Sequence, residues 1–190
     1  MNFSKIFFSS LFVFLFLTQF SFSENSKKRE QAIALNKQGK ELNNNSQAEI
    51  QLYIKALDTD SSYSVSYYNL GNVFFNLKDY DKALVYYQYS LDIAPQDTDA
   101  LYNIAFAFYK KKNHSQAVIH LQKLLKINQK DYEAMYFLSK IYMTTQSQTS
   151  LNAARTYLKD IIQNTMDLKL KDKSMKLQTK LEKILEVKKQ

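Results

Sequence analysis

The chain has 190 residues and a net charge of +8, and it contains 2 Gly, 1 Pro and no Cys. Nucleotide-binding loops and tight hairpins need several Gly or Pro residues together, and thiolate metal sites and disulfides need Cys, so these classes are excluded. The two His residues lie six positions apart, too far around a helix to form a two-His zinc motif. The composition therefore predicts an all-α protein without a metal or a cofactor.

Residues 1–23 differ in composition from the rest of the chain. They carry one charge, Lys5, followed by an apolar stretch, and they hold eight of the 13 Phe residues. A short basic start, about a dozen apolar residues and small residues at Ser21 and Ser23 are typical of a secretory signal peptide cleaved after Ser23. The alternative is an uncleaved membrane anchor, because Ile6 to Phe22 comprises 17 residues, at the lower edge of spanning length. Either way, we expect the remaining chain to be periplasmic or secreted.

Downstream of this segment the sequence repeats itself with a period of 34 residues. Tyr68, Tyr102 and Tyr136 are spaced by 34, and the same spacing holds for the triplets that begin at Tyr67, Leu70, Gly71 and Phe74. Ala83 and Ala117 continue the register. Self-similarity at a fixed period is typical of arrays in which each repeat is one supersecondary unit.

The period encodes two amphipathic helices in each repeat. Leu70, Gly71 and Phe74 lie on one face of a first helix, and Ala83 and Tyr87 lie on the apolar face of a second one after a polar turn. A Gly inside a helix costs about 1 kcal/mol relative to Ala, so we expect Gly71 to be compensated by close packing of the paired helices. Pro95 is placed to end a helix between repeats, and Asp97 and Asp131 are placed to cap the helices that follow.

The residues Tyr67, Leu70, Gly71, Phe74, Ala83, Tyr87 and Pro95 together resemble the tetratricopeptide repeat, W-x2-L-G-x2-Y…A-x3-F…P. The resemblance implies a domain over residues 24–166, a superhelix of about four helix-turn-helix repeats at about 26–63, 64–97, 98–131 and 132–165. The first unit, which carries Gly39, then needs a shortened loop at Asn43–Asn45. The fourth needs an insertion within Thr144–Ser150, which places Ala153 or Ala154 at the small position.

Residues 167–190 follow the repeats as one more amphipathic helix and a basic tail. Its apolar side comprises Leu170, Leu177, Leu181, Ile184 and Leu185. Repeat arrays need an end piece that covers the last exposed core, so we expect a capping helix. The alternative is a separate helix that binds a partner.

In tetratricopeptide arrays the first helices of successive repeats line a concave groove that holds an extended peptide or a partner's helix. The resemblance therefore implies a partner-binding groove formed by Tyr68, Asn69, Asn72, Phe75, Asn76, Tyr102, Asn103, Phe106, Tyr109, Tyr136 and Lys140. Asn side chains can pair with the N–H and C=O groups of a peptide, and we expect these amides to be exposed. The alternative for Tyr68, Tyr102 and Tyr136 is a ladder that packs neighbouring repeats together.

One specialised groove is unlike this sequence. Family members that clamp the C-terminal carboxylate of cytosolic heat-shock chaperones use two Asn and several basic residues at fixed places. Asn69 fits one Asn place, but Asp99 and Asn103 occupy the paired basic places, and shifting by one repeat offers Glu133 and Phe137. The sequence therefore does not predict a carboxylate clamp.

The charge is concentrated in the second half of the chain, since residues 1–109 have a balance of −2 and residues 110–190 a balance of +10. We therefore consider a basic patch for an anionic partner, formed by Lys110, Lys111, Lys112, Lys169, Lys173, Lys176 and Lys180. The alternative is a solvated lysine face that keeps the helices soluble. Nucleic acid is not an expected partner, because Arg, the usual base reader, is nearly absent.

No motif of a catalytic site is present in the sequence, and we expect no enzymatic activity. The sequence predicts an exported scaffold that binds another protein in its concave groove, within a bacterial envelope complex. The alternative is a basic binder of membrane headgroups or acidic polymers, with peripheral membrane contact.

Overall fold

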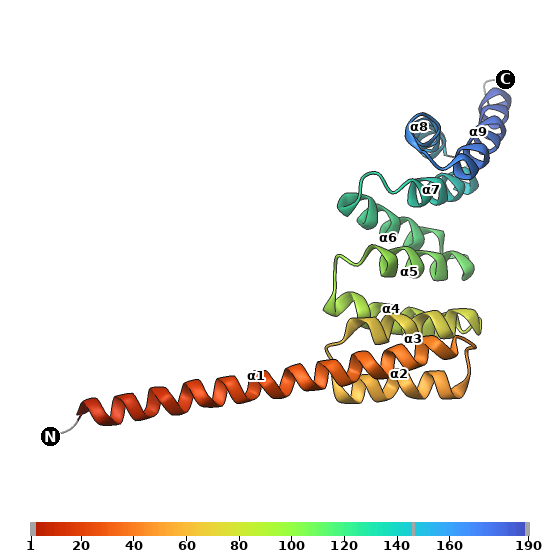
Figure 1. The fold of residues 1–190 in the computed structure, drawn as a ribbon. Helices are drawn as coiled ribbons and strands as arrows, with labels where there is room; N and C mark the ends of the chain where they lie inside the picture. Colours follow the sequence, from red (N-terminus) through yellow and green to blue (C-terminus); the bar gives the residue numbers. More distant parts are fainter. Residues whose placement is uncertain (1–2, 146, 189–190) are drawn as a thin grey trace.

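The computed structural model describes the backbone of residues 3–145 and 147–188, and the side chains from residue 22 onward within these ranges. Over these ranges the only regular secondary structure is helical (Figure 1). The helices are α1 (Phe3–Leu42), α2 (Gln47–Thr59), α3 (Ser64–Asn76), α4 (Tyr80–Ile93), α5 (Thr98–Lys110), α6 (His114–Ile127), α7 (Tyr132–Thr145), α8 (Gln148–Asn164) and α9 (Leu168–Val187).

The helices stack in chain order as an all-α superhelix of four antiparallel pairs. The pairs are α1 with α2, α3 with α4, α5 with α6 and α7 with α8, and each packs on the next one (Figure 1). The N-terminal half of α1 extends away from the stack. The predicted repeats and their order are confirmed, and the interrupted pairing at Asn43–Asn45 and near residues 144–150 falls where the sequence required changes of loop length.

Matched side-chain sizes hold the paired helices close together. A methyl group added at Gly71 would lie 2.4 Å from Cδ1 of Tyr87, and one added at Gly39 would lie 2.6 Å from Cε1 of Tyr53. The Gly residues therefore exist to admit the Tyr rings, as predicted for Gly71. In the next pair, the equivalent positions are occupied by Ala105 and the smaller Leu121, both fully buried.

The fourth pair follows the same rule with an insertion. Ser139 takes the small position on α7, and its hydroxyl donates to the backbone oxygen of Met135 at 2.8 Å. Ala154 takes the small position on α8, as one of the two predicted choices, and it is fully buried together with Leu158 one turn later. The two extra residues are thus absorbed in the connection between α7 and α8.

Side-chain caps define where the helices begin. Asp97 accepts hydrogen bonds from the backbone N–H groups of Asp99 and Ala100, and Asp131 accepts one from Ala134. Both predicted caps are confirmed, and Pro95 lies in the connection between α4 and α5, as expected. The turns that end α3 and α5 place Lys78 and Lys112 at φ angles of 63° and 61°, where Gly is usually found.

Charges follow the direction of the first helices. Asp97 and Asp99 lie at the start of α5, whereas Lys110, Lys111 and Lys112 lie at its end. Asp131 and Glu133 likewise lie at the start of α7. Acidic groups at helix starts and basic groups at helix ends complement the helix dipole. The edge where α3, α5 and α7 begin, called the acidic edge below, therefore differs in charge from the edge where they end, called the basic edge.

Helix α9 closes the array. Its buried residues Leu170, Leu181 and Leu185 join the core formed by α7 and α8, while Leu177 and Ile184 pack partly buried against it. Arg155 on α8 donates from Nε to Oε1 of Glu182 on α9 at 2.8 Å. The prediction of a capping helix is confirmed.

The predicted signal segment, residues 1–23, lies almost entirely outside the residues whose side chains are described. Within the described part of the chain, no helix combines the length and the apolar character needed to cross a membrane. The signal peptide therefore stays a prediction from the sequence.

Candidate functional site: the inner surface of the first helices

The predicted groove residues all lie on the first helices α3, α5 and α7, at equivalent positions of successive pairs. In a stacked helical array, the small rotation between repeats makes one surface concave. One position along this surface carries Asn72, Phe106 and Lys140 in turn. The surface therefore changes from amide to aromatic to basic along the array.

The predicted amides are engaged in hydrogen bonds between neighbouring first helices. Asn69 is only 8% exposed, and its Nδ2 donates to Oδ1 of Asn36 on α1 at 2.9 Å. The hydroxyl of Ser66 donates to the same oxygen at 3.1 Å. The expectation that Asn69 is exposed is therefore wrong, because a buried partner from the preceding repeat satisfies its amide.

Asn72 and Asn103 form a second junction. Asn103 donates from Nδ2 to the Tyr68 hydroxyl at 3.0 Å and to Oδ1 of Asn72 at 3.1 Å. The same Asn72 oxygen accepts from the Tyr87 hydroxyl at 2.8 Å. Both amides are half-buried, so they link α3, α4 and α5 while keeping part of their surface toward the solvent.

The three tyrosines of the predicted ladder pack between repeats to different extents. The ring of Tyr102 lies 5.7 Å from that of Phe137 on α7. Burial, followed by the charges of Glu133 and Asp131, raises the pKa of the Tyr102 phenol to about 12. Burial also raises the pKa of Tyr68 and Tyr136. The packing alternative thus describes Tyr68 and Tyr102, each of which contacts the next first helix.

A polar pocket of about 250 Å³ opens at the α1–α3 end of this surface. It is called the amide pocket here, and it is lined by Lys40, Asn43, Asn45, Glu49, Tyr53, Asn69, Asn72, Val73 and Asn76. Three of the predicted groove residues, Asn69, Asn72 and Asn76, meet in it. Carboxamides both donate and accept hydrogen bonds, so the pocket can pair with the main chain of a polypeptide regardless of its sequence.

The wall of the amide pocket is held rigid by Glu49, which stands where α4 and α6 have Ala83 and Ala117. Its carboxylate is 4% exposed and accepts from the backbone N–H groups of Asn44 and Asn45 at 2.9 and 2.8 Å. Its other oxygen accepts from the Tyr53 hydroxyl at 3.2 Å. Asn76 donates from Nδ2 to Oδ1 of Asn45 at 3.0 Å and so ties α3 to this loop.

Aromatic rings continue the surface beyond the amide pocket. The rings of Phe75 and Phe106 stack at 5.3 Å, and those of Phe106 and Tyr109 at 6.4 Å. Phe137, which is 4% exposed, meets Phe106 and Tyr109 edge-on at 5.5 and 5.2 Å. We call Phe75, Phe106, Tyr109 and Phe137 the aromatic strip. Its first three members are half-buried and present part of each ring to the solvent.

Two exposed lysines lie on the aromatic strip and next to it. The Nζ atom of Lys110 lies 5.0 Å from the centre of the Phe106 ring, and that of Lys140 lies 5.9 Å from the Tyr136 ring. Within the described ranges, neither lysine forms an ion pair. Each ammonium group is held by a ring face and is free to meet an acidic group from outside.

The lysines of the predicted basic patch do not share one surface. Lys110, Lys111 and Lys112 lie at the end of α5, whereas Lys169, Lys173, Lys176 and Lys180 lie on α9, with α7 between them in the stack (Figure 1). Lys111 pairs with Asp81, and Lys176 pairs with Asp172 at 2.7 Å. The two groups are therefore separate surfaces.

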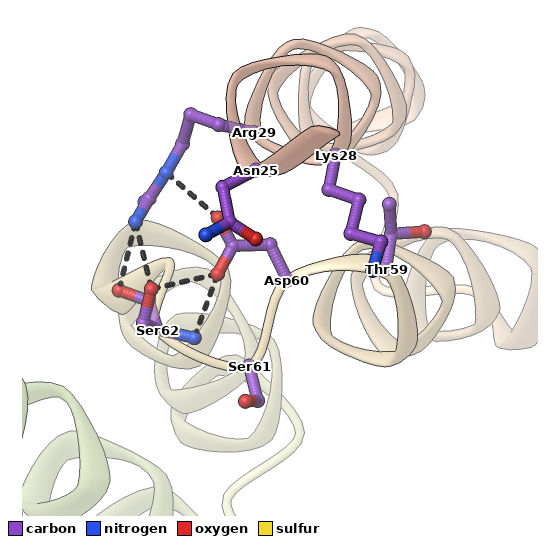
Figure 2. A pocket seen from close by; sticks show the side chains of 7 residues that line it. All are labelled: Asn25, Lys28, Arg29, Thr59, Asp60, Ser61 and Ser62. Carbon is purple, nitrogen blue, oxygen red and sulfur yellow. Dashed lines mark hydrogen bonds and ion pairs between the residues drawn. The ribbon is translucent and has the colours of Figure 1, made fainter. Parts of the chain in front are cut away.

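A second polar pocket, of about 400 Å³, lies where α1 meets the loop between α2 and α3 (Figure 2). Arg29 spans it, pairing from Nε with Oδ2 of Asp60 at 2.7 Å and donating from Nη2 to the Ser62 hydroxyl at 2.8 Å. Burial opposes ionisation of Asp60, but hydrogen bonds from Ser62 and the charge of Arg29 lower the pKa of its carboxyl. These contacts fasten α1 to the stack, so we assign this pocket a structural role.

Sequence reasoning missed the α1 and α2 side of the amide pocket, namely Lys40, Asn43, Asn45 and Glu49. The register of the first repeat was uncertain because its loop is shorter than in the later repeats. The Gly39–Tyr53 pair, which mirrors Gly71–Tyr87, was the signal that would have fixed the register.

Comparison with known proteins agrees with this architecture. Tetratricopeptide repeat profiles match residues 64–97 and 99–131, which are the second and third predicted repeats. No curated protein matches the chain in sequence.

Solved structures with the same arrangement include the first tetratricopeptide domain of Spaghetti (RPAP3) bound to the HSP90 peptide SRMEEVD. It has 20% identity and a TM-score of 0.59, and the match covers 63% of this chain and 96% of that one. The crystal structure of MamA has 14% identity and a TM-score of 0.61, covering 85% and 90%. A MamA RS-1 ArsTM double mutant has 17% identity and a TM-score of 0.59, covering 74% of both chains. At these identities the likeness establishes the fold, and together with the two matched repeats it shows that the chain belongs to the tetratricopeptide repeat family.

Proposed function

We propose that the chain is an exported scaffold that holds an extended segment of a partner protein on the inner surface of α1, α3, α5 and α7. Tetratricopeptide repeats build protein-interaction scaffolds, and this chain has that architecture. The observation that carries the proposal is the direct continuation of the amide pocket into the aromatic strip. Amides supply main-chain hydrogen bonds and rings supply apolar area, the two needs of an extended peptide.

The solved relative bound to an HSP90 peptide supports a peptide or protein as the kind of partner. The carboxylate clamp is not part of the proposal, because Asp99 and Asn103 still stand at the places that need basic groups. The α9 lysines alone remain for the anionic-surface alternative, with a smaller footprint than the predicted patch.

A matched pair of variants tests the groove. Asn76→Ala with Tyr109→Ala removes one amide and one ring from the inner surface. Gln88→Ala with Tyr89→Ala removes the same kinds of group from α4, where Tyr89 is 50% exposed and on a second helix. Crosslinking and pull-down from the producing cell should recover the same partner with the unaltered chain and the α4 variant, and lose it with the inner-surface variant. Equal recovery by both variants, with both folded by circular dichroism, would contradict the proposal.

Export is proposed from residues 1–23 alone. Mass measurement of the protein from its producing cell should show a chain that begins at Glu24. A chain that retains residues 1–23 would replace the free scaffold with one anchored in the membrane, and recovery of the chain from the cytosol would contradict export altogether.

A further inference from the structure

We propose that the inner surface selects partner segments in which an acidic residue neighbours a large apolar side chain, the acidic residue lying over Lys110 and Lys140. This inference rests on the proposed function and adds the chemistry of the partner. The supporting features are the distribution of charge along the first helices and the position of the two lysines on and beside the aromatic strip.

Acidic side chains are absent from most of this surface. Helix α3 contains no Asp or Glu, and in α5 and α7 the only ones are Asp99 and Glu133, which lie in the first turn at the acidic edge. From those first turns to the basic edge, the charged groups of α5 and α7 are Lys110 and Lys140. An acidic residue of a partner would therefore meet two ammonium groups without a competing carboxylate on these helices.

The two lysines are exposed but pre-positioned. Each Nζ lies over a ring, Lys110 over Phe106 at 5.0 Å and Lys140 over Tyr136 at 5.9 Å. A ring face beneath an ammonium excludes water from one side, which strengthens the attraction to a carboxylate on the other side. Holding the long side chain in place also reduces the entropy lost on binding.

The apolar neighbour follows from the aromatic strip. Phe75, Phe106 and Tyr109 are stacked yet half-buried, so part of each ring remains uncovered beside Lys110. A partner side chain such as Phe, Leu or Met would cover this area, and a fully buried side chain of this size contributes about 1.5–3 kcal/mol. Because the lysine and the ring belong to one site, the acidic and apolar residues of the partner must lie close together in its sequence.

The acidic edge makes the selection directional across the groove. Asp97, Asp99, Asp131 and Glu133 lie at the starts of α5 and α7, and their charges reach Tyr68 and Tyr102, whose pKa values they help to raise. A carboxylate placed at that edge would be repelled. The amide pocket has no such preference and accepts the main chain of the rest of the segment.

Selection from a displayed library of random peptides of about a dozen residues tests the inference. Three baits are compared: the full chain, the charge-reversal variant Lys110→Glu/Lys140→Glu, and the control Lys123→Glu/Lys126→Glu, which makes the same charge change at exposed positions of α6. The unaltered chain and the α6 control should enrich peptides with Asp or Glu beside a large apolar residue. The charge-reversal variant should instead enrich Lys or Arg beside such a residue.

A selected peptide then gives a quantitative test by fluorescence anisotropy. Lys110→Ala should weaken binding by about two- to tenfold, and the same substitution should have no effect on a peptide whose acidic residue is replaced by its amide. Raising the salt concentration should weaken binding of the acidic peptide more than that of its amide version.

The outcomes separate this inference from the proposed function. Enriched peptides that depend on Asn76 and Tyr109 but show no acidic preference, or the same preference with the charge-reversal variant, overturn the inference and leave the groove in place. Peptides that bind the Asn76→Ala/Tyr109→Ala variant as well as the unaltered chain overturn the proposed function. If no peptide is enriched by a folded bait, both are overturned.

Discussion

Replacing Gly71 by Ala should destabilise the protein, although Ala is the better helix former. In an open helix the change would gain about 1 kcal/mol. Here the new methyl group would lie 2.4 and 2.5 Å from Cδ1 and Cε1 of Tyr87, whose ring is 1% exposed and cannot swing into solvent. The ring must shift by about 1 Å to restore ordinary contact distances.

The cost of that shift can be worked out from its parts. Overpacking a buried site costs about 1–3 kcal/mol, and straining the 2.8 Å hydrogen bond from the Tyr87 hydroxyl to Asn72 adds about 0.5–1.5 kcal/mol. After the helix gain is subtracted, the net loss is about 1–3 kcal/mol. This corresponds to a fall in Tm of roughly 2–4 °C per kcal/mol for a chain of this size.

A double-mutant cycle isolates the contact. Tyr87→Leu alone should destabilise by loss of ring area and of the hydroxyl contact, but Gly71→Ala with Tyr87→Leu recreates the Ala105 and Leu121 pair of the next repeat. The double variant should be at least about 1 kcal/mol more stable than the sum of the single changes predicts. Urea denaturation followed by circular dichroism measures all four proteins. A Gly71→Ala variant as stable as the unaltered chain, or strictly additive effects, would refute the size-matching reasoning.

Three further predictions concern the turns, the buried carboxylate and the alkaline limit of stability. Lys112→Gly should stabilise the protein by about 1 kcal/mol, because φ is 61° and a side chain there costs about 1–2 kcal/mol; an unchanged urea midpoint would argue against strain at this turn. Glu49→Ala should destabilise by about 1–3 kcal/mol, since two loop N–H groups and one hydroxyl lose their acceptor, and hydrogen exchange of the 43–46 loop should accelerate while that of α7 does not. Tyr102 keeps its proton in the folded state to about pH 12, above its unfolded value of about 10, so its contribution to stability is complete below about pH 10 and is lost as the pH rises through about 12. Tyr102→Phe should therefore lose less stability than the unaltered chain between these pH values, and equal losses in urea midpoints would count against the shifted pKa.

The second and third repeats could be predicted in detail because their spacing is uninterrupted. Residues 64–131 keep the 34-residue register at every small and large position, so the helix pairs, the close contact of Gly71 and the caps at Asp97 and Asp131 all followed from the pattern. In the first repeat, Gly39 and Tyr53 lie 14 residues apart, whereas Gly71 and Tyr87 lie 16 apart. That difference hid half of the amide pocket.

The surroundings of individual side chains were harder to predict than the helices. An Asn on a helix is usually exposed, but Asn69 is buried because Asn36 supplies a partner from a repeat whose register the sequence left open. Phe137 occupies the position that is Asn69 and Asn103 in the preceding repeats, and it became the buried centre of the aromatic strip. Such partners are contributed by neighbouring helices, so a periodic pattern places each residue on a face without stating what lies opposite.

The opposite charges of the two groove edges have a kinetic consequence. Acidic groups at the starts of α5 and α7 and lysines at the end of α5 form a field across the groove, perpendicular to the axis of the array. At separations below a Debye length of about 8 Å in physiological salt, such a field turns an approaching polar segment before any contact forms. A partner with charge on one side would thus arrive already rotated, which raises the association rate more than the residence time. The caps that begin each helix then also serve as one pole of a guide for capture.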